Sequence, residues 1–295
     1  MKLAFVILSH RKPDRLFERF LGRLSAIPGA EIGLHHDFGQ SDFPTDFARQ
    51  HSIRMVEDWM PTQWAHNVPA TLKVFRMLFE QTDAEWFLTV SPNCYPLVSA
   101  EELVGFFDEA EEDVFMSLNR VVKNSPSGIL RNKYRFLFSK RVGRCPWISR
   151  HGKPYIRDLR IPISRAKTPF AAIDPFQGSD WFAMNRKTVR LMLDAELEVG
   201  AVSRYLEEVN SQLNTLVSSI EMVIQTFVGN HPGLKVHPNN LRFIDWKNAK
   251  NYHPNTLTMD HWAAIQASDA LFARKFAVGK SDELLDRIDG ELLGL

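Results

Sequence analysis

Short apolar runs alternate with segments of helical periodicity through the first third of the chain, and this alternation limits the fold more than any other feature. Residues 3–8 form a continuous apolar run typical of a buried strand, and residues 14–25 then place Leu16, Phe20 and Leu24 on one helical face. Further segments of these two kinds lie at residues 31–36, 53–56, 67–80 and 85–90. We therefore expect an α/β fold with a mostly parallel central sheet flanked by helices.

The order of these strands also predicts where a ligand would bind. In open parallel sheets, ligands bind beyond the carboxyl ends of the strands. The predicted strands end at residues 8–10, 36–37 and 91–95. We expect these three segments to share one edge of the sheet.

The later part of the chain is less regular. A strand is predicted at residues 182–184, and helices are predicted at residues 187–196, 219–228, 257–267 and 282–293. Between residues 120 and 167 the chain is rich in Gly and Pro and carries fourteen Lys or Arg residues against one acid, Asp158. Two interpretations of this basic stretch are open. It could contact an anionic acceptor, or it could be a solvated loop whose charge is balanced by acidic neighbours.

The composition narrows the functional classes. Hydrophobic residues make up 44% of the chain and charged residues 24%, as in an ordinary folded protein, and the net charge of +1 indicates no nucleic-acid partner. Cys94 and Cys145 match no metal-ligand or disulfide pattern, and no apolar run is long enough to span a bilayer. We expect a cytoplasmic protein without a transmembrane segment, at most peripheral to the inner membrane.

The familiar nucleotide and metal motifs are missing from the sequence. It contains no G-x-x-x-x-G-K-[ST], G-x-G-x-x-G, G-x-S-x-G, H-E-x-x-H or paired C-x-x-C motif. It also lacks the D-x-D triplet with which many sugar-nucleotide enzymes hold a divalent cation on a diphosphate. A diphosphate ligand would then need cations from the protein itself, so we expect no metal and no other cofactor.

Two adjacent cations near the C-terminus offer such a site. Arg274 and Lys275 lie within the apolar run 271–276. The donor fork of an arginine and the compact charge of a lysine suit a pair of phosphates. The other interpretation is an ordinary surface pair beside a buried Phe276.

Glu221 is a candidate general base because it is the lone carboxylate in the segment 218–226. Apolar surroundings would raise its pKa and suit it to proton abstraction. The alternative is that Glu221 completes a capping box with Ser218 at a helix N-terminus. The two roles are compatible.

Asp180 follows Gly178 and Ser179 and precedes Trp181. Gly-Ser before an acid is typical of a tight turn, in which Asp180 would satisfy local backbone amides. The functional interpretation is a carboxylate that hydrogen-bonds sugar hydroxyls above the aromatic ring of Trp181.

Seven segments carry recognisable motifs in a fixed order. They are residues 4–10 (AFVILSH), 32–37 (IGLHHD), 60–64 (MPTQW), 88–97 (LTVSPNCYPL), 178–186 (GSDWFAMNR), 239–246 (NNLRFIDW) and 272–276 (FARKF). Together they resemble the core-2/I-branching and peptide O-xylosyltransferase family of glycosyltransferases. The resemblance runs from about residue 3 to residue 276 and is poor in the basic stretch. The last three segments are similar to the xylosyltransferase branch.

The resemblance implies a GT-A-type fold with a Rossmann-like sheet, inversion at the anomeric carbon, and no metal requirement. It implies that Glu221 is the general base and that Arg274 and Lys275 neutralise the diphosphate of a UDP-sugar donor. The other implied contacts are UDP at Leu8, Ser9, His10, Asp37, Thr62 and Trp64, the donor sugar at Asp180, and the acceptor at Trp181 and Trp246. The sugar would be xylose or N-acetylglucosamine, with xylose slightly favoured, and the acceptor a hydroxyl on a glycan, lipid or peptide.

One catalytic domain over residues 1–295 accounts for this organisation. Its parts would be a nucleotide-binding half at residues 1–118, the basic insertion at residues 119–170, and an acceptor and catalytic half at residues 171–295.

The sequence departs from the family pattern at two places. Cys94 stands where the motif L-S-x-x-D-Y-P-L has its aspartate, and Trp64-Ala65-His66 stands where W-G-G is usual. These departures leave open a rival function, a catalytically inactive module that still binds a sugar or nucleotide. The missing disulfides and membrane anchor of animal relatives predict a bacterial catalytic core. A methyltransferase-like enzyme is disfavoured because residues 9–13 provide no glycine-rich turn.

Overall fold

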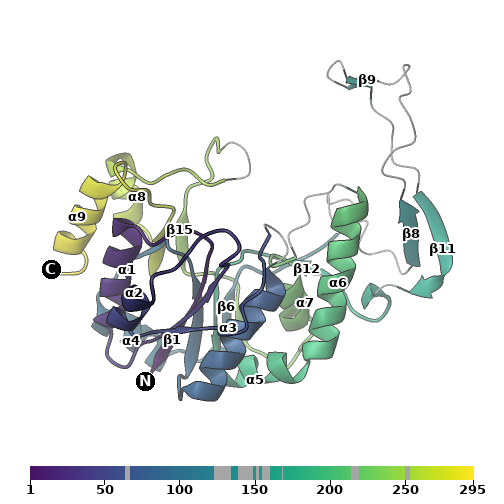
Figure 1. Cartoon of the computed structure of the whole chain (residues 1–295), viewed down its shortest axis with the longest axis horizontal. Coiled ribbons are helices and arrows are strands. Elements are labelled where there is room, and N and C mark those ends of the chain that lie inside the picture. The colour runs from purple at the N-terminus through teal and green to yellow at the C-terminus, as the bar shows by residue number, and fades with distance from the viewer. Residues whose placement is uncertain are drawn as a thin grey trace.

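The computed structural model of the chain describes residues 1–63, 67–122, 134–138, 149–150, 153–154, 160–167, 169–213, 219–249 and 253–295. A seven-stranded sheet forms its centre, in the order β14-β6-β13-β4-β1-β2-β3 (Figure 1). The strands are β1 (Leu3–Ser9), β2 (Glu31–His36), β3 (Ile53–Met55), β4 (Trp86–Val90), β6 (Val114–Met116), β13 (Phe182–Asn185) and β14 (Val236–His237). Within this sheet β13 alone runs antiparallel to its neighbours, so the predicted mostly parallel α/β sheet is confirmed.

The continuous apolar run of β1 is explained by burial on both faces of the sheet. Leu3, Phe5 and Ile7 point into one hydrophobic cluster, and Ala4 and Val6 point into another. Side chains alternate between the faces of a strand, so a strand covered on both sides needs apolar residues at every position.

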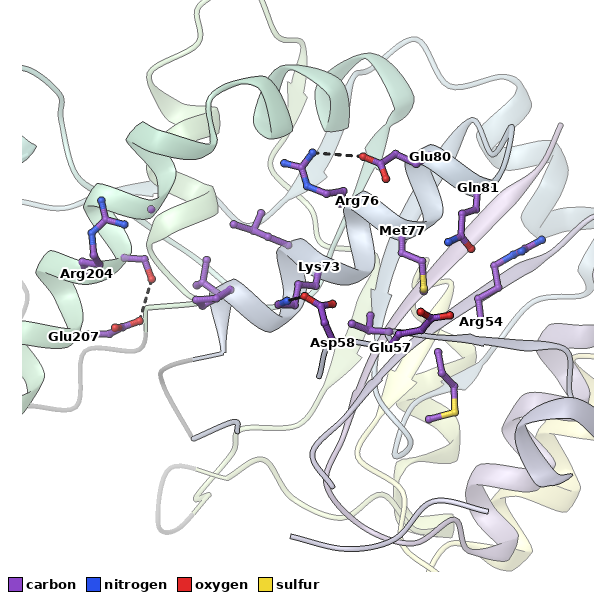
Figure 2. Close-up of a pocket in the computed structure, with 17 residues that line it drawn as sticks. Arg54, Glu57, Asp58, Lys73, Arg76, Met77, Glu80, Gln81, Arg204 and Glu207 are labelled. Carbon is purple, nitrogen blue, oxygen red and sulfur yellow. Dashed lines mark hydrogen bonds and ion pairs between the residues drawn. The ribbon is translucent and has the colours of Figure 1, made fainter. Parts of the chain in front are cut away.

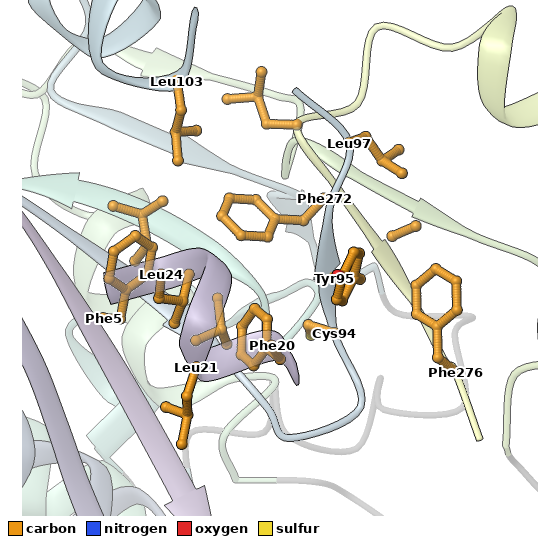
Figure 3. Close-up of a cluster of buried hydrophobic side chains, with 14 of the residues drawn as sticks. Phe5, Phe20, Leu21, Leu24, Cys94, Tyr95, Leu97, Leu103, Phe272 and Phe276 are labelled. Atoms are coloured by element: carbon orange, nitrogen blue, oxygen red, sulfur yellow. The ribbon is translucent and has the colours of Figure 1, made fainter. Parts of the chain in front are cut away.

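The first cluster packs helices and a small second sheet against one face of the main sheet. The helices are α1 (Arg15–Ser25), α2 (Thr45–Gln50), α4 (Ala100–Asp108), α8 (Trp262–Gln266) and α9 (Asp282–Glu291). The small sheet has the order β15-β16-β5, with β15 at Arg242–Ile244, β16 at Phe272–Arg274 and β5 at Tyr95–Pro96. Figure 3 shows how Phe20 of α1, Tyr95 of β5 and Phe272 of β16 meet in this cluster, with Cys94 among them.

The C-terminal helix α9 is fastened to this layer by a buried carboxylate. Asp289 accepts hydrogen bonds from Arg19 and Arg23 of α1, each at 2.6 Å from Nη2, and from the hydroxyl of Tyr95 at 2.7 Å. The side chain of Asp289 is 8% exposed, so these bonds replace its lost hydration. The network brings the two ends of the chain together beside β5.

The second cluster covers the opposite face with α3 (Val68–Gln81), α5 (Arg186–Asp194), α6 (Glu196–Leu213) and α7 (Val223–Gly229). Figure 1 shows these helices on the side of the sheet away from α1 and α9. Among the described residues, no helix combines the length and the apolar character needed to cross a bilayer.

The remaining elements are short and lie in or beside the basic stretch. They are β7 (Asn119–Arg120), β8 (Tyr134–Phe138), β9 (Ser149–Arg150), β10 (Lys153–Pro154), β11 (Arg160–Lys167), η2 (Pro169–Ala171) and β12 (Phe176–Gln177). Strands β8 and β11 pair antiparallel and lie beyond α6 in Figure 1.

Two predicted helices differ from the structure. The helix expected at residues 219–228 begins only at Val223. Residues 219–222 form a turn instead, and the backbone oxygen of Glu221 in this turn accepts a hydrogen bond from the amide of Gly178. The helix expected at residues 257–267 is reduced to the single turn η3 (Met259–His261) followed by α8. By contrast, α4 and α6 were not predicted from periodicity.

Candidate active site

A cleft of about 500 Å³ lies beyond the carboxyl ends of β1 and β4 and gathers residues that are far apart in the sequence. Parallel strands β1, β2 and β4 are neighbours, so the three predicted strand ends do share one edge of the sheet. Nine of the twelve predicted site residues line this cleft: Leu8, Ser9, His10, Asp180, Trp181, Glu221, Trp246, Arg274 and Lys275.

The turn before β13 brings Asp180 close to Glu221. Gly178 has no room for a side chain, because a Cβ atom there would lie 1.7 Å from the backbone oxygen of Ser117. Its amide donates a hydrogen bond of 2.9 Å to the backbone oxygen of Glu221. The glycine thus lets its segment pack against the backbone of Ser117, while its amide binds the turn that carries Glu221.

Asp180 is held in an unusual electrostatic environment. Its Oδ1 atom is buried and has no hydrogen-bond partner among the described residues. Burial and the nearby Glu221 raise the pKa of Asp180 to about 7, although the cation of Arg274 acts in the opposite direction. Near neutral pH this group is therefore partly protonated, and a protonated carboxyl can donate a hydrogen bond as well as accept one.

Glu221 lies in the turn before α7 and not in the first turn of a helix. The expected capping box is not formed by α7, whose N-cap is Met222, and Ser218 lies outside the described residues. The residue remains exposed to solvent, but partial burial of its carboxyl raises its pKa. A carboxylate that is accessible and more basic than usual suits proton abstraction.

The two predicted cations line the same cleft. The guanidinium of Arg274 lies 4.2 Å from the ring centroid of Trp181, and its Nε atom is buried without a hydrogen-bond partner in the described chain. Burial and the like charges of Arg274 and Arg11 lower the pKa of Lys275. Like charges held together in a cleft are typical of an anion-binding site.

An exposed aromatic ring marks the outer rim of the cleft. Trp246 lines the cleft and is 54% exposed, which is unusual for so large an apolar side chain. Trp181 lies deeper and is covered on one face by Arg274. Both rings are therefore placed where a sugar could stack.

Asp37 and Thr62 do not line the cleft, but they organise the loop beside it. The carboxylate of Asp37 accepts hydrogen bonds from the amide of Thr62 at 2.7 Å, from the side chain of Gln40 at 2.6 Å, and from the amide of Gly39 at 3.0 Å. Burial opposes ionisation of Asp37, but these donors outweigh it and lower its pKa to about 2. The amide of Asp37 also binds the backbone oxygen of Ser9.

Both oxygens of Asp37 are thus engaged by protein donors, and a direct contact with uridine would have to share or displace one of them. Trp64, the remaining predicted contact, lies outside the described residues.

Sequence reasoning missed three buried polar side chains that hold the site together. The hydroxyl of Thr89 donates to the backbone oxygen of Asp180 at 2.8 Å, and the side chain of Gln225 donates to that of Ser179 at 2.9 Å. The third is Arg242, which donates to the backbone oxygen of Thr89 at 3.1 Å. The available signal was a single polar residue inside an apolar run, since such a residue needs a partner when the run is buried.

A larger cavity of about 960 Å³ lies elsewhere, between β3, α3 and α6 (Figure 2). It contains none of the predicted site residues, and several of its charges are paired within the protein, as in Lys73 with Asp58 and Arg76 with Glu80. The smaller cleft is the better candidate for chemistry, because it joins carboxyl groups of raised pKa to a pair of adjacent cations. The described residues contain no group of three or more His, Cys, Asp or Glu side chains arranged to hold a metal ion.

Comparisons with a family model and with individual proteins point to the same family. The family model for the Core-2/I-Branching enzyme matches residues 4–270. Beta-glucuronosyltransferase GlcAT14A of Arabidopsis thaliana is 27% identical and aligns with 99% of this chain and 61% of its own length. Beta-glucuronosyltransferase GlcAT14B of the same plant is 26% identical and aligns with 84% of this chain and 54% of its own length. Xylosyltransferase 1 of Mus musculus is 23% identical over 100% of this chain and 31% of its own length.

The chain therefore spans less than two thirds of the length of these relatives. Because the family model covers most of the chain, the chain belongs to the Core-2/I-branching enzyme family of glycosyltransferases.

Proposed function

We propose that this protein is an inverting glycosyltransferase that moves a sugar from a UDP-sugar to an acceptor hydroxyl without a divalent metal. The observation that carries the proposal is the meeting of Glu221, Asp180 and the Arg274-Lys275 pair in one cleft. Such a transfer needs a base for the acceptor proton and positive charge for the leaving diphosphate, and Glu221 and the Arg274-Lys275 pair would provide them.

In the proposed mechanism, the acceptor hydroxyl approaches the anomeric carbon from the side opposite UDP. Glu221 takes the hydroxyl proton as the new carbon–oxygen bond forms. The bond between the anomeric carbon and the β-phosphate oxygen breaks at the same time, and its electron pair leaves with UDP. Arg274 and Lys275 stabilise the negative charge that develops on the diphosphate.

Asp180 has a different part in this proposal. With a pKa of about 7 it is partly protonated near neutral pH, so it can donate a hydrogen bond to the donor sugar without adding a full negative charge beside the diphosphate. Trp181 and Trp246 would bind the acceptor through their rings.

Three donor sugars are candidates. The resemblance of the GSDWFAMNR segment favours xylose over N-acetylglucosamine. The names of the plant relatives add glucuronic acid as a third candidate. Together with the name of the mouse xylosyltransferase, they indicate that similar chains act on different sugars.

The inactive-module alternative rests on Cys94 and on Ala65-His66, and the latter two residues lie outside the described part of the chain, so only Cys94 can be judged from its surroundings. That residue is fully buried and does not line the cleft, so the missing aspartate removes no group from the described cleft wall. Catalysis is accordingly the stronger proposal.

A UDP-release assay tests the proposal directly. The protein would be incubated with UDP-xylose, UDP-N-acetylglucosamine or UDP-glucuronic acid, with and without excess EDTA. We expect UDP release from one donor to exceed that from the others and to be unchanged by EDTA. Binding of UDP without release from any donor would instead support the inactive module, and a strict requirement for manganese would contradict the proposed cation site.

A further inference from the structure

Arg242 is a buried cation behind the candidate cleft. The residue is 8% exposed, and its guanidinium lies 4.5 Å from the ring centroid of Phe272 in β16. Burial lowers the pKa of Arg242 to about 10; nearby Cys94 partly offsets this, and Arg274 adds to it. Arg242 is nevertheless charged at neutral pH, and a buried charge persists only where polar partners hold it.

The partners of Arg242, which is the first residue of β15, are a backbone carbonyl of the main sheet and the carbonyls of the two residues just before β15. Its Nη2 donates to the oxygen of Thr89 in β4 at 3.1 Å, and its Nη1 donates to those of Asn240 and Leu241 at 3.3 Å each. Among the described residues it forms no ion pair with a carboxylate. Its guanidinium therefore joins the main sheet to the chain that enters β15.

The two segments that Arg242 connects each contact a residue of the cleft. On the main sheet, the hydroxyl of Thr89 holds the backbone oxygen of Asp180 at 2.8 Å. On the small sheet, β15 pairs in parallel with β16, and Ile244 stands opposite Arg274. Arg242 itself does not line the cleft.

We propose that Arg242 is a positioning residue, which fixes the small sheet bearing Arg274 against the main sheet bearing Asp180. It thereby sets the separation between the diphosphate cations and the carboxyl that faces the donor sugar. The identity of the ligand, UDP, rests on the proposed function, but the positioning of Arg274 does not.

Arg186 supplies a matched control. Its guanidinium also lies over a phenylalanine ring, 4.2 Å from the centroid of Phe79, and also donates to backbone oxygens, those of Ala84 at 3.0 Å and Phe79 at 2.7 Å. It does not line the cleft. Replacing either arginine removes the same kind of contacts, but only Arg242 links the two sheets at the site.

The test compares Arg242→Gln, Arg242→Lys and Arg186→Gln by thermal unfolding and by UDP titration calorimetry well below the unfolding midpoint. Both glutamine variants should unfold at lower temperature. Arg242→Gln should weaken UDP binding by about tenfold, because Arg274 and Lys275 move by a fraction of an ångström or more, whereas Arg186→Gln should leave UDP binding unchanged. Arg242→Lys keeps the charge without the donor fork, so it should show a smaller loss and provides a second variant if the glutamine form does not fold.

A second readout does not depend on UDP. Arg274 lies over Trp181, so its displacement should change the emission of that tryptophan, measured as the difference between each protein and its Trp181→Phe counterpart. We expect a changed difference spectrum for the Arg242 variants and an unchanged one for Arg186→Gln.

These outcomes separate the two proposals. If the wild-type protein binds no UDP, the proposed function fails, and the Trp181 emission still decides the role of Arg242. Wild-type emission and wild-type UDP affinity in folded Arg242 variants would overturn the positioning role. Equal losses in the Arg186 variant would show that Arg242 contributes only to general stability.

Discussion

Asp37 and Asp180 show how surroundings decide the chemistry of one residue type. Asp37 is buried but receives several hydrogen bonds, and its pKa falls to about 2. Asp180 lies near Glu221 with a buried Oδ1 atom that has no partner in the described chain, and its pKa rises to about 7. Donors stabilise the ionised form of Asp37, whereas desolvation and a like charge disfavour the ionised form of Asp180. Protein donors engage both oxygens of the first carboxylate, whereas the second has an oxygen that no described residue engages.

Replacing Glu221 by Gln should abolish transfer while leaving the fold and UDP binding intact. The amide keeps the shape of the side chain but cannot take a proton, and loss of a general base typically lowers kcat by roughly 100- to 10,000-fold. Steady-state kinetics with the preferred donor would measure the loss, and Glu80→Gln in the other cavity serves as a control. Wild-type turnover in Glu221→Gln would remove this residue from the mechanism.

The raised pKa of Asp180 predicts a pH-dependent stability. In the unfolded chain the group titrates near 3.8, and in the folded protein near 7, so the folded state holds the proton more tightly between these values. The contribution of Asp180 to the free energy of unfolding is therefore full below about pH 4 and is lost as pH rises toward 7. Denaturant unfolding at pH 5 and pH 8 should show a smaller loss with pH for Asp180→Asn than for the wild type. Equal losses in the two proteins would argue against the raised pKa.

At the scale of elements, the site depends on where a few connections begin and end. The turn before α7 keeps Glu221 outside the helix, and the turn before β13 binds the backbone of Glu221 through Gly178. Thr89 then fixes the start of β13 to the end of β4. These short connections carry the candidate chemistry, and the strands and helices around them hold the connections in place.

Gly178→Ala should disrupt the β13 connection because its Cβ atom would lie 1.7 Å from the backbone oxygen of Ser117. No flexible side chain can relieve that contact, so we expect a loss of at least about 3 kcal/mol in the free energy of unfolding. A Cβ atom added at Gly105 in α4 would meet no atom within 4 Å, so Gly105→Ala should be neutral or stabilising by roughly 0.5–1 kcal/mol. Urea denaturation would compare the two variants, and similar stabilities would show that the turn can relax.

At the scale of the whole molecule, the fold brings two sheets together at one cleft. The turn that leads into β13 of the main sheet contributes Asp180, and the small sheet contributes Arg274 from a strand more than 90 residues later in the chain. The charges are also unevenly distributed, because the fourteen cations between residues 120 and 167 leave the rest of the chain net acidic.

That charge distribution predicts a salt effect if the basic stretch binds an anionic acceptor. Raising ionic strength screens exposed charges, so the KM for an acidic acceptor should increase while the KM for the UDP-sugar changes less, since the donor cations are partly buried. Kinetics at low and physiological salt with an acidic and a neutral acceptor would test this. An equal response of the two acceptors would support the alternative of a solvated loop.

Much of the architecture could be predicted from the sequence because local patterns encode it. The periodicity around residues 3–8 and 14–25 predicted β1 and α1 closely, and parallel pairing then placed three strand ends at one edge. Adjacent charges in an apolar run and a lone carboxylate also identified Arg274, Lys275 and Glu221 as candidates, whereas the contacts with uridine and acceptor came from the family resemblance. These inferences need only neighbours in the chain, where the geometry of a strand or helix is already known.

The tertiary structure alone decided how those residues behave. The pKa of Asp180, the saturation of the Asp37 carboxylate and the link made by Arg242 all depend on groups distant in the sequence. Desolvation and hydrogen bonding act over a few ångströms in space, and no local pattern states which distant groups will fall within that range.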